Sequence, residues 1–105
     1  MLNVSMEFRK GILFVRLYGV LNDSTLDIFE KEVKEVIVRA GILYVVLNVI
    51  NLDEVSKNGI ILIKRLKRII EKNEGMFFLY GSEIKDLKKI VNLDNELRVF
   101  ERVVI

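Results

Sequence analysis

The fold is decided by one stretch of the sequence, VVLNVINLDEVSKNGIILIKRLKRIIEK, residues Val45–Lys72. Its first residues, Val45 to Val49, form an apolar run that predicts a buried strand. The largely polar stretch from Ile50 to Lys57 then predicts a turn, which closes on Asn58-Gly59 at the start of a helix. Because open α/β sheets place ligands and partners outside the carboxyl ends of their strands, we expect the function to lie between this strand and this helix.

The helix that follows is predicted to be amphipathic and to pack on a sheet. Its apolar residues recur at helical spacing. They are Ile60, Ile63, Leu66, Ile69 and Ile70. The remaining positions are largely basic, namely Lys64, Arg65, Lys67, Arg68 and Lys72.

The chain upstream predicts a β-hairpin. Apolar and polar residues alternate over Asn3 to Arg9 and over Ile12 to Gly19, which is typical of half-buried strands. Lys10-Gly11 between them suits a two-residue turn, because glycine tolerates a positive φ.

A helix is predicted after the hairpin, ending near Val38. Asp23, Ser24 or Thr25 is expected to cap its first turn, and Gly41 to end it. The β-branched run Ile42 to Val49 then predicts an interior strand, parallel to its neighbour.

Three further elements are predicted downstream: a strand over Met76 to Tyr80, a helix over Glu83 to Asn92 and an edge strand over Leu97 to Phe100. The whole order indicates an α/β fold with one mixed sheet, an N-terminal hairpin followed by parallel strands, and helices packed on it. With 105 residues, the chain is expected to form a single domain, residues 1–105.

Composition excludes several classes of function. The sequence contains no Cys and no His, so thiol or imidazole catalysis, Cys/His zinc sites and disulfides are excluded. We expect no metal, no cofactor and no catalytic residue. No apolar run approaches the ~18 residues of a membrane span and no signal peptide is recognisable, so we expect a cytoplasmic protein without a membrane partner.

Several segments together resemble a STAS domain, the fold named for sulfate transporters and anti-sigma-factor antagonists. They are YGVLNDST before the first helix, YVVLNV, NLDEVSKNGIILI, FFLYG and the closing NLDNELRVF. The resemblance covers nearly the whole chain, and its order and spacing carry it. The small size resembles that of free-standing bacterial antagonists.

The resemblance implies a partner. In bacterial members, an anti-sigma factor that is also a serine kinase binds the antagonist around the loop before the second helix and phosphorylates a Ser there. The usual Asp-Ser-Ser-Gly is here Ser56, Lys57, Asn58 and Gly59, so the acceptor position holds Asn58, which has no hydroxyl. Asn48 replaces the Asp that often ends the preceding strand.

The resemblance therefore implies a partner-switching protein of transcription regulation whose usual phosphorylation is lost or moved. We expect Asn58 to keep the N-capping role of the missing Ser. Ser56 is either an unorthodox acceptor or, more simply, a turn or capping residue. The two Asn replacements fit either a constitutively active antagonist or a repurposed domain. The expected partner-binding residues are Asp53, Glu54, Val55, Ser56, Lys57, Asn58 and Gly59, which we call the entry segment, together with the exposed side of the helix from Ile60 to Lys72. Oligomerisation beyond a monomer or weak dimer is not expected.

Three other classes of function were weighed. An anion or nucleotide could bind the helix N-terminus at Gly59 with Lys57 and Lys64, although Walker-type spacing is missing. Nucleic acid could bind the basic helix, but the net charge is only +2 and no recognised motif accompanies it, so no nucleic-acid partner is expected. The pair Asp53-Glu54 could serve acid-base catalysis, but no nucleophile or metal ligand accompanies it, and an enzyme is the weakest interpretation.

Overall fold

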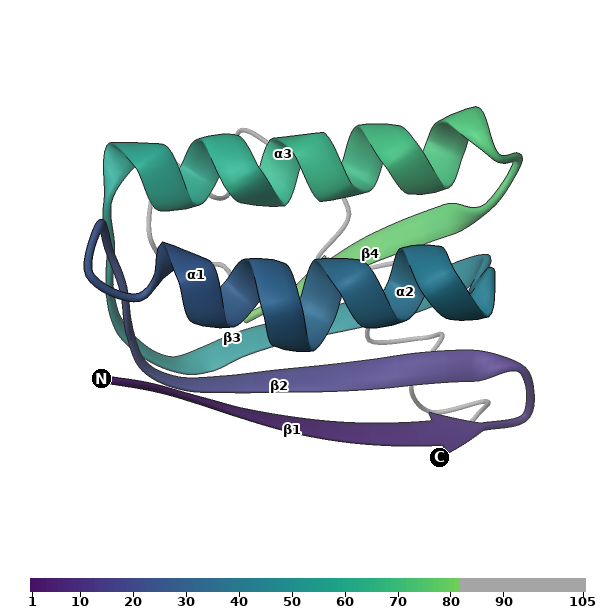
Figure 1. Cartoon of the computed structure of the whole chain (residues 1–105). Coiled ribbons are helices and arrows are strands. Elements are labelled where there is room, and N and C mark those ends of the chain that lie inside the picture. Colours follow the sequence, from purple (N-terminus) through teal and green to yellow (C-terminus); the bar gives the residue numbers. More distant parts are fainter. Residues whose placement is uncertain (82–105) are drawn as a thin grey trace.

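The computed structural model of the chain describes residues 1–81, and these residues build one mixed sheet. The strands are β1 (Leu2–Arg9), β2 (Ile12–Leu21), β3 (Tyr44–Val55) and β4 (Met76–Tyr80). They lie in the order β1-β2-β3-β4, with β1 antiparallel to β2 and the other pairs parallel. The predicted α/β fold is confirmed (Figure 1). The helix predicted at 83–92 and the strand predicted at 97–100 lie outside the described residues.

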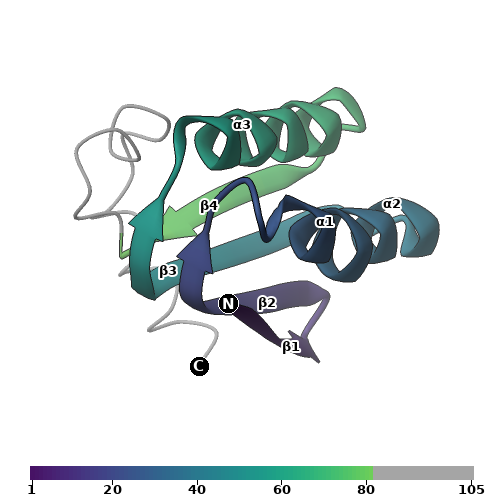
Figure 2. The ribbon, with the colours of Figure 1, turned by 60° about the vertical axis from the view of Figure 1, so that its left-hand side comes forward.

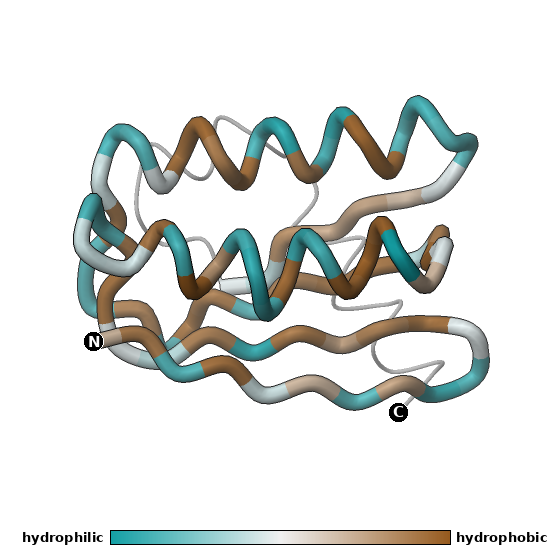
Figure 3. Tube along the Cα trace, in the orientation of Figure 1, coloured by the Kyte–Doolittle hydropathy of each residue, from teal (hydrophilic) through white to brown (hydrophobic). Residues whose placement is uncertain are grey.

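Two helical segments cover the same face of this sheet. The first consists of α1 (Leu26–Phe29), η1 (Glu30–Lys34) and α2 (Glu35–Ala40), and the second is α3 (Lys57–Lys72). They run side by side over the strands, as Figures 1 and 2 both show. Apolar and polar residues alternate along them as their turns face the sheet and the solvent (Figure 3).

The main core lies between the helices and the sheet. Each interior strand contributes alternate residues to it, because successive side chains of a strand point to opposite faces. From β2 and β3 these are Leu13, Val15, Leu17, Val45 and Leu47, all buried. The other face of the sheet carries a smaller buried cluster of Ile12, Phe14, Val46 and Phe78.

The β1–β2 turn is the predicted two-residue turn. Lys10 has φ 52° and Gly11 has φ 82°. Positive φ at both positions is the geometry of a type I′ turn, whose twist matches the flanking strands. The register that follows pairs Arg9 with Ile12 and Leu2 with Gly19.

The first helical segment ends as predicted but begins differently. Gly41 is its left-handed C-terminal residue, with φ 64°. Thr25 occupies the N-terminal capping position, yet its side chain makes no capping hydrogen bond. Instead its hydroxyl donates to the Val20 carbonyl at 3.0 Å and accepts from the Asn22 amide at 2.9 Å. Side-chain capping of this helix by Thr25 was therefore a wrong prediction, because the buried hydroxyl closes the preceding turn instead.

Strand β3 is longer than its sequence indicates. The predicted turn over residues 50–57 is wrong, since β3 continues to Val55. Two register shifts against β2 explain the misleading pattern: Arg16 and Tyr18 pair with Asn48 and Asn51, and Gly19 and Val20 pair with Leu52 and Glu54. Each shift places one extra residue in β3, as a β-bulge does.

The bulges set which residues of β3 reach the core. Val49 and Leu52 are buried and Val55 packs against the same cluster, so the inward positions are three apart instead of two. A period of three is not the alternation by which strands are recognised. The polar residues between these positions remain exposed at the carboxyl end of the sheet.

Candidate functional site

The candidate site lies where β2 and β3 end beside each other. Figure 2 shows both strands ending at the same edge of the sheet, each leading toward its helix. The amide of Ser56, directly after β3, donates a 2.8 Å hydrogen bond to the carbonyl of Leu21, the last residue of β2. This bond places the start of α3 next to the turn that precedes α1.

Ser56 is the N-capping residue of α3. Its backbone is extended, with φ −76° and ψ 167°, and its hydroxyl oxygen accepts the Gly59 amide at 3.1 Å. This geometry satisfies one of the amides that a helix N-terminus leaves without an intrahelical partner. The simpler of the two roles considered for Ser56, capping, is thus confirmed.

Asn58 is not the N-cap, and the prediction that it takes this role is wrong. It lies inside the first turn of α3, where its side chain is exposed. From there its Nδ2 donates a 2.9 Å hydrogen bond to Oδ1 of Asp23, 35 residues away in the chain. Helix α3 begins at Lys57, one residue before Asn58, because Ser56 supplies the cap.

Asp23 was not identified from the sequence as a residue of the site. Its only signal was its place in the polar run after β2, where it was considered as a cap. The structure brings it to Asn58, and the neighbouring Asn22 accepts the Ser24 amide at 2.9 Å in a local turn. The site therefore includes the turn before α1 as well as the entry segment.

Gly59 is buried where α3 crosses the end of β2. A Cβ at this position would lie 2.9 Å from Cγ of Leu21 and 3.0 Å from its carbonyl oxygen. The first distance is shorter than real Cβ atoms show and the second is tighter than most, so a side chain at position 59 would force Leu21 or α3 to shift. Gly59 brings the first turn of α3 down onto β2.

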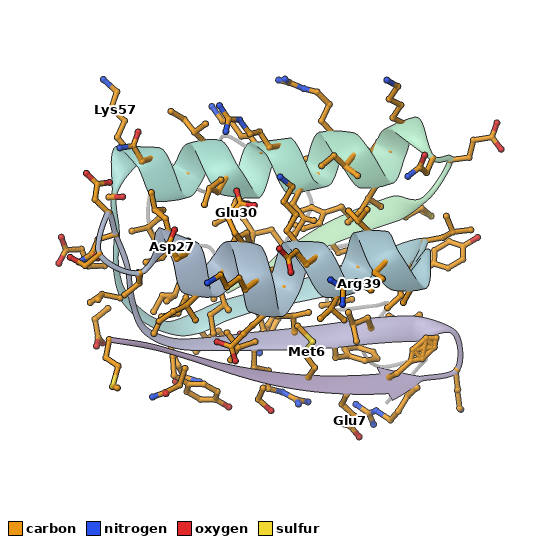
Figure 4. All side chains as sticks on the ribbon, in the orientation of Figure 1. Met6, Glu7, Asp27, Glu30, Arg39 and Lys57 are labelled. Carbon is orange, nitrogen blue, oxygen red and sulfur yellow. The ribbon has the colours of Figure 1, made fainter. Side chains whose placement is uncertain are left out.

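The side chains that the entry segment presents to solvent are charged or amide groups. Asp53, Glu54, Lys57 and Asn58 are exposed, whereas Val55 and Ser56 are half-buried. Lys57 stands at the start of α3 and points away from the sheet (Figure 4). Within residues 1–81, no cluster of three or more Asp or Glu side chains is arranged to hold a metal ion.

The resemblance implied that Asn48 would lie at the end of its strand, but it lies in the middle of β3. Its Oδ1 accepts the amide of Ile50 at 3.0 Å. This bond lies at the first bulge of β3, where the ladder to β2 is interrupted. Asn48 therefore has a local structural role several residues before the entry segment.

No helix in the described part of the chain is long and apolar enough to cross a membrane.

A family model and a curated relative both connect this chain with the same family. The family model described as "STAS domain" matches residues 3–104. A curated relative, the anti-sigma F factor antagonist of Paenibacillus polymyxa, is 33% identical over 76 residues, which are 71% of this chain and 65% of the relative. The aligned region thus spans about two thirds of that relative's length.

Solved structures show the same fold at low sequence identity. The unphosphorylated anti-sigma factor antagonist SpoIIAA has a TM-score of 0.73 at 18% identity, covering 98% of this chain and 97% of that one. An anti-sigma factor antagonist from Mycobacterium paratuberculosis has a TM-score of 0.78 at 15% identity, covering 99% and 94%. With the family model matching nearly its whole length and these folds agreeing, the chain belongs to the STAS domain family.

Proposed function

We propose that this chain is an anti-sigma factor antagonist that binds a kinase-type anti-sigma factor through the entry segment. The observation that carries the proposal is the 33% identity to the anti-sigma F factor antagonist of Paenibacillus polymyxa, within a STAS match over residues 3–104. The protein would act by binding and not as an enzyme. The proposed antagonist consists of one domain, residues 1–105. It would act in the cytoplasm as a monomer or weak dimer.

The burial pattern of the entry segment supports a binding role. Its exposed polar side chains stand together at the carboxyl edge of the sheet, where α/β folds bind partners. Its less exposed residues have structural tasks: Ser56 caps α3 and Gly59 packs on Leu21. The exposed residues would make the contacts, while Val55, Ser56 and Gly59 hold them in place.

The phosphorylation switch would be absent at position 58. Asn58 has no hydroxyl, and its amide is hydrogen-bonded to Asp23. A phosphate here would add about −1.5 to −2 charges beside that carboxylate, which would repel it. We propose that partner binding is not switched off by phosphorylation at position 58. The alternative is that the phosphate acceptor has moved to Ser56.

An anion-binding role for the same helix N-terminus has less support. The amide of Gly59, which this role would use, is already donated to Ser56 Oγ. Lys64 lies nearly two turns further along α3 than Lys57. Titration with ATP or inorganic phosphate, followed by backbone amide shifts, would show whether residues 57–59 bind an anion.

The test is a pull-down from the native lysate with three baits: wild type, Asn58→Arg and the control Lys31→Ala. Lys31 is exposed on η1, away from the entry segment. The proposal expects wild type and Lys31→Ala to retain an ATPase-type anti-sigma kinase, and Asn58→Arg to lose it while keeping its thermal midpoint. Equal retention by all three baits would place the contact elsewhere, and retention by none would refute the antagonist role.

A further inference from the structure

An apolar hollow lies at the end of the molecule opposite to the entry segment. Figure 1 shows the β1–β2 turn and the end of α2 at one end of the sheet, and the start of α3 at the other. The hollow lies between that turn and the connection from α2 to β3, has a volume of about 410 Å³ and is open to solvent. Seven residues line it, and none of them is charged; they include Phe8, Ala40, Gly41 and Leu43.

The hollow is held open by positions that carry little or no side chain. A Cβ on Gly11 or on Gly41 would meet no atom within 4 Å beyond its chain neighbours. Both glycines have positive φ, 82° and 64°, which the β1–β2 turn and the end of α2 require, so a larger residue is disfavoured at either place. Ale adjacent lining position holds only the methyl group of Ala40. The backbone itself therefore fixes this space.

Phe8 gives the hollow an apolar wall that remains in contact with solvent. Alternate side chains of β1 point to the helical face of the sheet, where Val4 and Met6 pack against the main core. Phe8 is the next residue of this row, yet it is 55% exposed. Leu43 and Tyr44, which also line the hollow, are exposed as well. Covering these side chains would be favourable for an apolar ligand.

One uncompensated positive charge stands beside the hollow. The charged residues that directly adjoin its lining in the sequence are Glu7, Arg9, Lys10 and Arg39. Glu7 pairs with Arg9 at 3.0 Å, and Arg39 pairs with Glu35 at 3.6 Å. Lys10 is exposed in the β1–β2 turn, and within residues 1–81 it has no salt bridge or side-chain hydrogen bond. An apolar hollow beside a single free ammonium is complementary to an apolar group that carries one negative charge.

The size of the hollow favours a small molecule over a protein. Its lining consists of seven residues, whereas a stable protein interface uses about 20–30 residues on each side. Small-molecule sites have volumes of about 300–1,000 Å³, a range that includes this hollow. A second copy of the chain, meeting it about a two-fold axis, would also bring the two Lys10 side chains toward each other.

From these observations we propose that the hollow binds a small amphiphile with one apolar chain and one carboxylate, the chemistry of a fatty acid. The chain would lie against Phe8 and over Gly11 and Gly41, where no side chain obstructs it. The carboxylate would pair with Lys10, because one ammonium suits its single charge better than the ~1.5 to 2 charges of a phosphate. This site is separate from the entry segment and does not rest on the proposed function, so a failed pull-down would leave it intact.

The test titrates the whole chain with decanoate, at concentrations below micelle formation, and follows the backbone amides by NMR. The amides of Gly11 and Gly41 should shift saturably, while that of Gly59 in the entry segment should not. Octanoate and hexanoate should bind more weakly, by up to about fourfold for each methylene lost, because each one buries less apolar surface. Decyltrimethylammonium carries the opposite charge on the same chain and should bind severalfold more weakly than decanoate.

Charge variants test the carboxylate contact. Lys10→Asp reverses the charge and preserves the turn, since Asp-Gly is a preferred pair in type I′ turns. It should weaken decanoate binding about fivefold or more. The matched control Lys31→Glu makes the same change of net charge at an exposed position on η1 and should weaken binding far less.

Two further variants test the apolar contact. Ala40→Phe places a large side chain at an exposed lining position, where no packing is lost, and should weaken decanoate binding about tenfold by filling the hollow. Phe8→Ser removes the apolar wall and should weaken it severalfold, whichever way a phenyl ring at position 40 turns. The matched control Ile61→Phe enlarges an exposed apolar side chain on α3 and should bind like wild type.

The proposal is overturned if decanoate gives no saturable shifts, if the shifts centre on Gly59, or if decyltrimethylammonium binds as tightly. It is also overturned if Lys10→Asp and Lys31→Glu lose affinity equally, or if Ala40→Phe and Phe8→Ser both bind like wild type. A concentration-dependent dimer that Ala40→Phe dissociates, without decanoate binding, would assign the hollow to a second copy of the chain.

Discussion

Gly59 and Leu21 approach each other so closely that α3 and β2 are joined through a position without a side chain. A Cβ on Gly59 would lie 2.9 Å from Leu21 Cγ, and Leu21 is fully buried. Gly59→Ala should therefore destabilise the fold by about 1–2 kcal/mol, because overpacking outweighs the gain of ~1 kcal/mol in helix propensity. Urea denaturation measures this loss, with Lys57→Ala as an exposed control in the same turn. A variant as stable as wild type would mean that Leu21 moves aside at no cost.

Ser56 should contribute to stability through its hydroxyl. Ser56→Ala removes the acceptor of the Gly59 amide and should cost about 1 kcal/mol. Ser56→Asp supplies another capping oxygen, and its carboxylate is favourable at the helix N-terminus, so it should remain close to wild type. The two midpoints in urea distinguish capping from simple loss of a side chain. If both variants are destabilised equally, the capping bond does not account for the effect of Ser56.

The proposed function predicts that a hydroxyl at position 58 restores modification. Asn58→Ser should be phosphorylated by the anti-sigma kinase in the presence of ATP, whereas wild type should gain no phosphate at position 58. Mass spectrometry of the intact protein and of its peptides measures this. Ser56→Ala/Asn58→Ser controls for transfer to Ser56. Phosphate on Ser56 in the wild-type protein would show that the acceptor has moved.

Arg68 should lower the stability of the helix that carries it. Arg68→Glu replaces two like-charge pairs, with Lys64 and Lys72, by two pairs of opposite charge, each worth about 0.2–0.5 kcal/mol. The free energy of unfolding should rise by up to ~1 kcal/mol, and the midpoint temperature by a few degrees, ~4–8 °C per kcal/mol. Lys67→Glu should do the reverse, since it breaks the 2.7 Å pair with Glu71. A fall in the midpoint of Arg68→Glu would mean that the like-charge pairs with Lys64 and Lys72 do not lower the stability of α3.

Much of the architecture could be predicted from local patterns. Lys10-Gly11 and Gly41 were read correctly because each adopts a backbone conformation that few residues tolerate, and their φ values are positive as expected. Strand β4 was predicted with its observed bounds, Met76–Tyr80, since its apolar run lies between two glycines. These features depend on a few neighbouring residues.

The end of β3 could not be predicted in the same way. Val49, Leu52 and Val55 face the core only because two bulges advance β3 against β2, and a bulge depends on the partner strand. Asn58 was misread for a related reason. Both Ser and Asn cap helices well, and only the chain path shows that Ser56 holds the capping position.

Over the described residues, the sequence by itself determined the order of the strands and of the two covering helical segments, and the absence of a hydroxyl at position 58, because these follow from periodicity, turn residues and side-chain chemistry. Only the tertiary structure decided what position 58 contacts. Asp23 is 35 residues away and reaches Asn58 because β2 and β3 end beside each other and Gly59 lets α3 pack onto Leu21. Contacts between distant segments depend on how the strands are registered and packed, and no local pattern in either segment encodes them.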